Sequence, residues 1–311
     1  MKKMIQKIRN NIYLLLFLVT SFLTSCSQVK KGGGDTHRVG NVDFFVDESF
    51  RPLFTTSVDT FKGLNPKANI NAIYEPEGII INKFLNDSIK AICVSRNLTE
   101  EERLFLNKKK VNIQTDKIAT DAIALIVNDL NIDTNISIEN LKKILNGEID
   151  TWQHFKTKIN VVFDKTNSAN YNYLRKLVQV DKFPLNVFAV ESNQEVINYV
   201  KNNKSALGII GLNWISDSDD PKAVNFMKGI TVMGVSSKEG GEYFKPFSGY
   251  LYTKEYPLTR EIWILNKGSR NGLHTGLVLF MKGEKGQIIV EKSALVPANA
   301  PIRLIEISTE E

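Results

Sequence analysis

Apolar and polar positions alternate in blocks along the first third of the chain. Apolar runs of strand length lie at residues 39–49, 67–75 and 89–95. Stretches with helical spacing follow them at 51–66, 78–87 and 99–109. In the first, Phe54, Val58 and Phe61 recur at i, i+4 and i+7. Thr99 and Glu102 have the spacing of a capping box. This alternation predicts a parallel sheet with helical crossovers.

The second half continues the pattern with less regularity. Further strand-like runs lie at residues 117–128, 159–164, 206–215 and 260–268. Helical spacing is found at 137–148, 169–178 and 195–203, and 271–295 predicts a pair of helices. Gly208 and Gly211 interrupt an otherwise buried strand, which indicates close packing of its backbone. The whole chain therefore has the order of an α/β protein.

The first 25 residues have the pattern of an export signal. Lys2, Lys3, Lys7 and Arg9 precede an apolar run at residues 12–23, which is too short to span a bilayer comfortably. The run ends in Leu-Thr-Ser-Cys, which resembles the lipobox of bacterial lipoproteins. We expect a signal peptide over 1–25, lipid on Cys26 and a Gly-rich flexible tether over 26–38. A plain signal peptide or a short membrane anchor is the alternative.

Charge and cysteine content exclude several classes of function. The net charge of +6 falls to +2 without the four cations of the signal, so no nucleic-acid partner is expected. With Cys26 lipidated, Cys93 has no partner and is expected to be a buried hydrophobe. The three histidines lie far apart without ligand spacing. No metal and no cofactor are therefore expected.

Several segments together resemble one family. They are "DESFRPLF" at 47–54, "VSRNLTEEE" at 94–102, "DAIALIVN" at 121–128, "LKKILNGEIDTW" at 141–152, "ALGIIGLNWI" at 206–215, "YPLTREIWIL" at 256–265 and "GQIIVEKSALVPA" at 286–298. Their order and spacing are similar to those of the phosphate-binding proteins of Pst-type ABC transporters. The resemblance extends from about residue 39 to residue 307.

The resemblance implies a periplasmic-binding-protein type II fold. Two α/β lobes would be joined by a hinge of two crossing strands, near residues 117–123 and 241–262. Lobe one would comprise 39–120 plus 241–311, and lobe two 121–240. The ligand would lie in the cleft between the lobes, where strands end and helices begin.

Four strand-to-helix loops supply the candidate ligand-binding residues. Helix starts offer free backbone N–H groups, and serine hydroxyls add short donors. The residues are Glu48, Ser49 and Phe50 in the first loop, Glu77 in the second, Ser95 and Arg96 in the third, and Asn167, Ser168, Ala169 and Asn170 in the fourth. The sequence thus predicts an oxyanion site built by loops from both lobes.

These loops depart from the family pattern. The resemblance implies an SGT-like run in the fourth loop, where this chain has Ala169 and Asn170 in place of Gly and Thr. Glu48 and Glu77 bring carboxylates to loops that the family fills with Gly and Ser. One carboxylate can accept the proton of hydrogenphosphate, whereas two together repel a dianion. Arg51 and Arg96 are the residues placed to offset them.

Each candidate also has a purely structural interpretation. Ser49, Ser95, Asn167 and Ser168 can be ordinary helix caps, Arg96 a surface charge or a salt bridge between lobes, and Glu77 a carboxylate that favours a helix start. Only their convergence on one cleft would make them a site.

The function that the sequence predicts is that of a lipid-anchored substrate-binding protein, with no catalysis. It would bind phosphate, act as a monomer with an ABC transporter permease, and face the periplasm from the membrane. The alternative is a lipoprotein of the same fold whose diverged cleft binds another anion, a small molecule or a protein partner. Acidic residues left uncompensated in the cleft would favour that alternative.

Overall fold

The computed structural model describes residues 35–180, 182–267 and 271–299. Its strands are β1 (Gly40–Asp47), β2 (Ala68–Glu75), β3 (Ala91–Val94), β4 (Ile113–Asn128), β5 (Asn135–Ser137), β6 (Asn160–Phe163), β7 (Val187–Ala189), β8 (Ala206–Gly211), β9 (Ile230–Val232), β10 (Gly234–Ser236), β11 (Thr259–Lys267) and β12 (Val296–Pro297). Its helices are α2 (Arg51–Leu64), α3 (Glu77–Leu85), α4 (Glu100–Lys108), α5 (Ile138–Leu145), α6 (Ala169–Val178), α7 (Asn193–Asn202), α8 (Pro221–Met227), α9 (Ser248–Tyr252), α10 (Leu273–Lys282) and α11 (Glu284–Lys292). The 3-10 turns are η1 (Glu48–Phe50) and η2 (Leu212–Trp214).

A long, mixed sheet organises the described chain. Its strand order is β2-β1-β3-β11-β4-β8-β6-β7, and β9 and β12 pair with β4. The pairs β1–β2, β1–β3, β6–β7 and β6–β8 are parallel, as the strand–helix alternation predicts. The central pairs β3–β11, β11–β4 and β4–β8 are antiparallel. Two parallel groups therefore flank an antiparallel centre.

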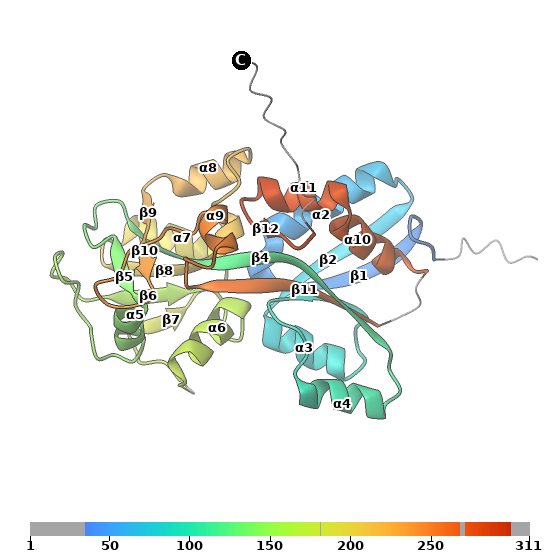
Figure 1. Cartoon of the computed structure of the whole chain (residues 1–311), viewed down its shortest axis with the longest axis horizontal. Helices are drawn as coiled ribbons and strands as arrows, with labels where there is room; N and C mark the ends of the chain where they lie inside the picture. Colours follow the sequence, from blue (N-terminus) through green and yellow to red (C-terminus); the bar gives the residue numbers. More distant parts are fainter. Residues whose placement is uncertain (1–34, 181, 268–270, 300–311) are drawn as a thin grey trace, which may run out of the picture. The chain divides into compact units, whose positions relative to one another are not determined.

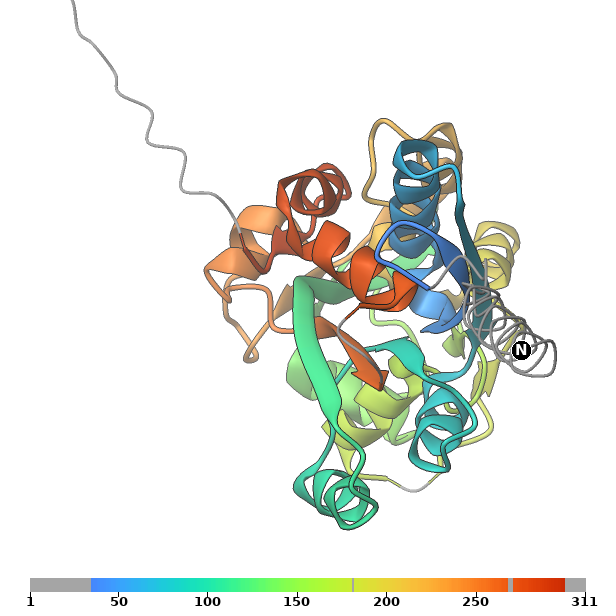
Figure 2. The ribbon, with the colours of Figure 1, turned by 90° about the vertical axis from the view of Figure 1, so that its right-hand side faces the viewer.

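β4 and β11 form that centre and lie side by side in both ribbon views (Figures 1 and 2). β4 pairs with β11 as far as Ala122 and with β8 from Ile123 onward. The first predicted hinge segment, residues 117–123, falls within β4. Strand β11 returns the chain from the second group of the sheet to the first. The antiparallel pair thus has the connectivity expected of a two-strand hinge, and the lobe boundaries at 120 and 240 stay a prediction.

Helices cover both faces of the sheet. α2, α10 and α11 lie over one face of the β1–β3 group, and α3 and α4 lie on the other (Figure 1). On the second group, α7 covers one face while α5 and α6 lie on the opposite one (Figure 1). α3 and α6 contact each other, although they belong to different groups. Their first turns meet where the site is formed.

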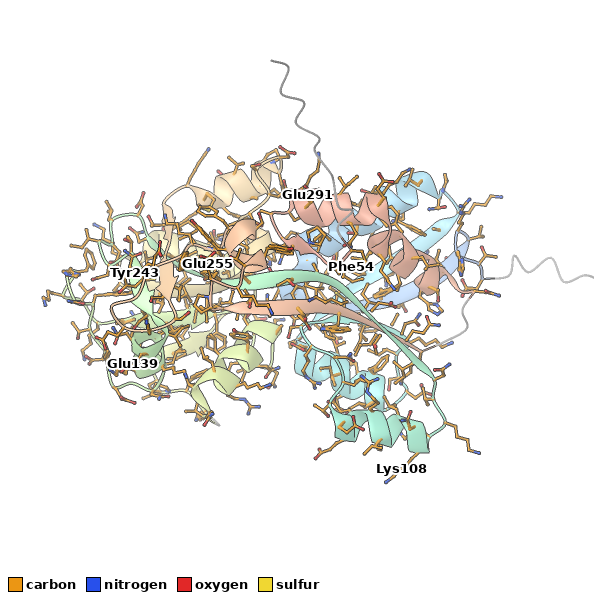
Figure 3. All side chains as sticks on the ribbon, viewed as in Figure 1. Phe54, Lys108, Glu139, Tyr243, Glu255 and Glu291 are labelled. Atoms are coloured by element: carbon orange, nitrogen blue, oxygen red, sulfur yellow. The ribbon has the colours of Figure 1, made fainter. Side chains whose placement is uncertain are left out.

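The buried apolar residues form two clusters, a large one through both groups of the sheet and a smaller one under α3 and α4. Phe54 on α2 is fully buried and its ring lies 5.0 Å from that of Phe44, whereas Lys108 at the end of α4 is exposed (Figure 3). Cys93 is free and buried, as predicted. Trp152 is also buried, and its indole N–H donates to the Ser205 carbonyl at 3.0 Å, so it packs within the fold.

Most elements predicted from periodicity are present. Thr99 and Glu102 form the predicted capping box, and the helix pair near the C-terminus divides at Gly283. The periodicity missed the short elements β5, β7, β9, β10, α8 and α9. These have three to seven residues, too few to repeat a hydrophobic period.

No helix among the described residues is long and apolar enough to cross a membrane. The predicted signal peptide and Cys26 lie outside the described residues. The last residues of the predicted tether, 35–38, are described, and Asp35 Oδ1 accepts from the Leu273 amide at the start of α10 at 2.9 Å.

Gly208→Ala tests the close packing of β8. A Cβ at this position would lie 2.6 Å from Val200 Cγ2 and 2.7 Å from Ile126 Cγ1. We expect the substitution to lower the free energy of unfolding by roughly 1–3 kcal/mol, because a packed interior resists an added methyl group. The measurement is urea denaturation.

Gly63→Ala is the matched control. Its Cβ would meet no atom within 4 Å near the end of α2, so it should raise stability by about 0.5–1 kcal/mol. A Gly208→Ala protein as stable as the parent would contradict this packing.

Candidate functional site

The site lies where strand ends from both groups of the sheet meet. β1 ends at Asp47, β3 is followed by Ser95, and β6 is followed by Asp164. The first turns of η1, α3 and α6 begin within a few residues of the ends of β1, β2 and β6. Parallel strands deliver their carboxyl ends to one edge of a sheet, which is where such proteins bind ligands.

Asp47 is the centre of this site. Its Oδ2 accepts the backbone amides of Glu77 at 2.8 Å and Ala169 at 3.0 Å, and its Oδ1 accepts that of Ser49 at 3.0 Å. These amides belong to the starts of three helices, and Asp47 is fully buried. We call the three amides the Asp47 cradle. It holds an oxyanion, and the oxyanion is part of the chain itself.

Opposing forces act on the Asp47 carboxyl. Burial raises its pKa above the usual value, while hydrogen bonds from Ser49 and Ala169 and the charge of Arg260 work against that rise. The site therefore keeps a carboxylate away from water and compensates it with N–H dipoles and a single guanidinium.

Asp164 is surrounded by donors. They are Ser168 Oγ at 2.7 Å, Ser49 Oγ at 3.3 Å, Asn193 Nδ2 at 3.1 Å and Asn170 Nδ2 at 3.2 Å. Burial and the nearby Asp47 raise the pKa of the Asp164 carboxyl to about 8. Ser49 comes from one group of the sheet and the other donors from the second, so Asp164 joins the two.

Glu48 makes a similar connection at the edge of the network. Its Oε2 accepts the backbone amide of Asn193 at 3.2 Å and the side-chain amide at 2.6 Å, and Arg51 lies 3.5 Å from its Oε1. Burial raises the pKa of Glu48 to about 7. Because Asn193 is the first residue of α7, Glu48 lies where the helix dipole favours negative charge.

Glu77 differs from these carboxylates because it is only half satisfied. Its Oε2 accepts from Ser95 Oγ at 2.7 Å. Its Oε1 is buried and accepts no hydrogen bond, and the residue is 1% exposed. Burial, followed by the charge of Asp47, raises the pKa of Glu77 to about 7. An unsatisfied buried acceptor is unusual and indicates that a donor is missing.

Arg260 on β11 is the cation of the network. Its Nε donates to Asp121 Oδ2 at 3.0 Å, and its Nη1 donates to Asn170 Oδ1 at 2.7 Å. Its Nη2 lies 2.9 Å from Asp121 Oδ2 but makes no hydrogen bond. The guanidinium also lies over the Phe50 ring, 4.8 Å from the centroid. Of the five guanidinium N–H groups, two are therefore hydrogen-bonded, and Nη2 donates to no acceptor.

Direct hydrogen bonds also join the two parallel groups of the sheet. The Gly78 amide donates to the Asn167 carbonyl at 2.9 Å, and Asn213 Nδ2 donates to the Ser49 carbonyl at 2.7 Å. Asn167 has a φ of 66°, in the left-handed region that asparagine tolerates. These contacts need no bound ligand.

A cleft of about 930 Å³ adjoins the buried network. Glu77, Ser95 and Arg96 line it on one side, and Arg260 lies at its inner wall. The other side is formed by α6 and the two residues after it, from Asn172 to Val180. Its volume is in the range of ligand sites.

The structure divides the residues predicted from sequence between two places. Glu77, Ser95 and Arg96 line the cleft. Glu48, Ser49, Ser168 and Asn170 have buried or mostly buried side chains in the network, Ala169 contributes its amide, Asn167 its carbonyl, and Phe50 lies in the core. The predicted loops do converge, but most of their polar groups bind one another.

Several structural interpretations of the candidates hold. Ser168 caps α6, accepting the Tyr171 amide at 3.1 Å, and its single O–H is donated to Asp164. Arg96 forms a bidentate pair with Glu102 at 2.8 and 2.7 Å. Ser95 does not cap the helix that follows it, because the N-cap of α4 is Thr99; its hydroxyl donates to Glu77. Helix α6 begins at Ala169, as the sequence predicts.

The sequence reasoning missed five residues of the network: Asp47, Asp121, Asp164, Asn193 and Arg260. Asp47 and Asp164 had a usable signal, because each lies at the end of a predicted strand and immediately before or within a candidate loop. Nothing in the local pattern of Arg260 indicates that a strand would bury it. Despite the carboxylates, no group of metal-ligating side chains is found among residues 35–180, 182–267 and 271–299.

Two sheet groups around an antiparallel hinge pair, with a polar cleft at their strand ends, define a periplasmic-binding-protein architecture. The family model of the PBP superfamily domain matches residues 33–282, and the chain belongs to that family. Among curated proteins it is similar to the phosphate-binding protein PstS of Borreliella burgdorferi. The two are 26% identical over 297 residues, covering 92% of this chain and 97% of that protein.

Solved structures share the fold. One is a putative phosphate ABC transporter substrate-binding protein with bound phosphate from Clostridium perfringens, with a TM-score of 0.70 and 19% identity, covering 84% of this chain and all of that one. Another is an ABC-type phosphate transport receptor from Vibrio cholerae, with a TM-score of 0.62 and 19% identity, covering 82% and 99%. Both confirm the predicted fold class.

Glu77→Gln should alter how stability depends on pH. A carboxyl whose pKa is raised by folding stabilises the fold below its usual pKa and loses that stabilisation as pH rises through the folded value. For Glu77 this window runs from about 4.5 to about 7. Glutamine carries no charge. In thermal or urea unfolding, the free energy of unfolding of Glu77→Gln should therefore fall less across this pH window than that of the parent, by roughly 1–3 kcal/mol.

Glu261→Gln is the control for that experiment. A hydrogen bond from Lys117 lowers the pKa of Glu261, so its stabilisation is present above the usual pKa and lost as pH falls. Between about pH 4.5 and about pH 7, the free energy of unfolding of Glu261→Gln should therefore fall by as much as that of the parent. An unchanged pH profile in Glu77→Gln would show that Glu77 is not the buried acid described.

Proposed function

We propose that this chain is the substrate-binding protein of an ABC transporter, and that it binds inorganic phosphate in the cleft beside Glu77 and Arg260. Membership of the PBP superfamily and the names of its relatives support the class. The function is binding without catalysis, and the partner is a transporter permease that receives the solute. We expect the protein to act as a monomer and to need no cofactor.

One observation carries the choice of ligand. At the wall of the cleft, Glu77 Oε1 is a buried acceptor without a donor, and Arg260 Nη2 is a buried donor without an acceptor. Hydrogenphosphate offers one O–H group and several anionic oxygens, so it can satisfy both atoms. Ser95 holds the Glu77 carboxyl in position from the opposite oxygen.

Positive charge along the cleft supports the same proposal. Arg175 and Lys176 on α6 and Arg96 after β3 line it together with Arg260. They face only Glu77 and Glu261 among the acidic lining residues. The cleft is thus more favourable for an anion than the buried network behind it.

A second candidate follows from the acids that surround Arg260. Asp47, Glu77, Asp121 and Asp164 are all buried, and Glu48 is 12% exposed at its side chain. Such an excess of carboxylates favours the diverged-cleft alternative, in which another anion or a small molecule replaces phosphate. Binding measurements decide between the two.

The location at the cell envelope remains part of the proposal. The basic start, the apolar run and the Leu-Thr-Ser-Cys sequence support export and a lipid on Cys26 that faces the periplasm.

The pH dependence of anion binding tests the role of Glu77. Sulfate carries no proton at neutral pH, so it needs Glu77 in its protonated form. Because the pKa of Glu77 is about 7, its protonated fraction drops from about one half at pH 7 to about one tenth at pH 8, and sulfate affinity should fall by about fivefold between them. Phosphate brings its own proton and should lose much less. Calorimetric titration of the full-length protein at pH 6, 7 and 8 measures both.

Glu77→Gln is the matched variant. Its amide can donate to either ion, so the preference for phosphate at pH 8 should disappear. No phosphate binding by the parent at millimolar concentration would overturn the proposed ligand and favour the diverged cleft.

Cys26→Ser tests the anchor. The thioether that carries the lipid cannot form on serine, so the protein should leave the membrane fraction or detergent phase. The measurement is phase partition of cell extracts, with Cys93→Ser as the control that should stay membrane-bound. A Cys26→Ser protein that still carries lipid would refute the anchor.

A further inference from the structure

The amides of the Asp47 cradle form the part of the site best suited to an oxyanion. The starts of α3 and α6 and the 3-10 turn η1 point their N–H groups at one carboxylate, and the first two are of the kind that binds sulfate, phosphate and carboxylate ligands at helix N-termini. All three amides are satisfied by Asp47. The anion that an external ligand would supply is already present in the chain.

We propose that Asp47 is a built-in anion that determines specificity: it fills the cradle, excludes free oxyanions from it, and leaves the adjoining cleft as the place where ligand binds. That Asp47 fills the cradle does not depend on the proposed function. Only the identity of the ligand in the cleft rests on it.

Charge and space both support the exclusion. An incoming phosphate would have to expel Asp47 from its three amides, which leaves a buried carboxylate without partners and is strongly unfavourable. Alternatively it would have to lie beside Asp47 and Asp164, both fully or almost fully buried. Like charges at that distance repel strongly away from water. Neither course is open to a dianion.

The unsatisfied atoms of the cleft are an observation independent of the cradle. Glu77 and Arg260 both line the cleft, and Glu77 Oε1 and Arg260 Nη2 are buried and make no hydrogen bond. In contrast, all oxygens of Asp47 and Asp164 accept hydrogen bonds from within the chain. The polar groups that still need a ligand are therefore outside the cradle.

Asp47 also connects the two groups of the sheet. Its own strand, β1, lies in the first group, and the Ala169 amide that it accepts starts α6 in the second. A bound anion would make the same connection in an unfilled cradle. The chain obtains this closure from its own carboxylate.

Asp47→Ser tests the proposal, with Asp47→Asn as the control. Serine removes the carboxylate and leaves room at the three amides, whereas asparagine keeps the volume and one acceptor oxygen but removes the charge and replaces the other oxygen by an NH2 group. Inorganic phosphate is titrated calorimetrically into each full-length protein at pH 7. We expect Asp47→Ser to bind phosphate at least tenfold more tightly than the parent, and Asp47→Asn to show no such gain.

Thermal unfolding in phosphate and in chloride of equal ionic strength accompanies the titration. Phosphate should raise the unfolding temperature of Asp47→Ser more than that of the parent, because a ligand that binds only the folded state stabilises it. If Asp47→Ser does not fold alone, phosphate and not chloride should restore its folded state.

The outcomes separate the two proposals. A folded Asp47→Ser protein with the phosphate affinity of the parent overturns the built-in anion and leaves phosphate binding in the cleft intact. A gain in Asp47→Ser with no binding by the parent supports the built-in anion and overturns phosphate as the ligand of the cleft. No phosphate binding by any of the folded proteins overturns both.

Discussion

The arrangement of this site depends on one interaction, the capture of the Asp47 carboxylate by three backbone amides. Those amides come from segments far apart in the chain, and each lies at the first turn of a helix. Helix starts have unsatisfied N–H groups that need a partner when buried. Asp47 supplies that partner, so the ends of β1, β2 and β6 can pack together without water or an external ion.

The remaining polar groups follow from this placement. Burial, followed by the charge of Asp47, raises the pKa of Asp164 and Glu77, and Arg260 is the one guanidinium that opposes these shifts within the buried network of the described residues. Asn170 and Asn193 use their amides to separate and satisfy these groups. The result is a network that joins the two groups of the sheet. Its unsatisfied atoms include Glu77 Oε1 and Arg260 Nη2, from residues that line the cleft, and Asp121 Oδ1 and Asn213 Oδ1 behind it.

The sequence predicted the fold well and the site only in part. Long periodic segments such as residues 117–128 fix β4, and the family resemblance supplied the topology that periodicity cannot give. Loop composition correctly brought Glu48, Glu77 and Ser168 to one region. It could not show that the Ser168 hydroxyl would bind Asp164, four residues earlier, in place of a ligand. Nor could it show that a strand residue such as Arg260 would be buried among acids, because its pairing with Asn170 and Asp121 across 90 and 139 residues is set by tertiary packing alone.

Amide hydrogen exchange of the ligand-free protein, in buffer without phosphate or sulfate, tests the central claim most directly. If Asp47 fills the cradle, the amides of Ser49, Glu77 and Ala169 must exchange as slowly as the ladder amides of β4, because each is buried and hydrogen-bonded without any ligand. Fast exchange of Glu77 and Ala169 that becomes slow only when an anion is added would show that the cradle is empty and that the account of Asp47 is wrong.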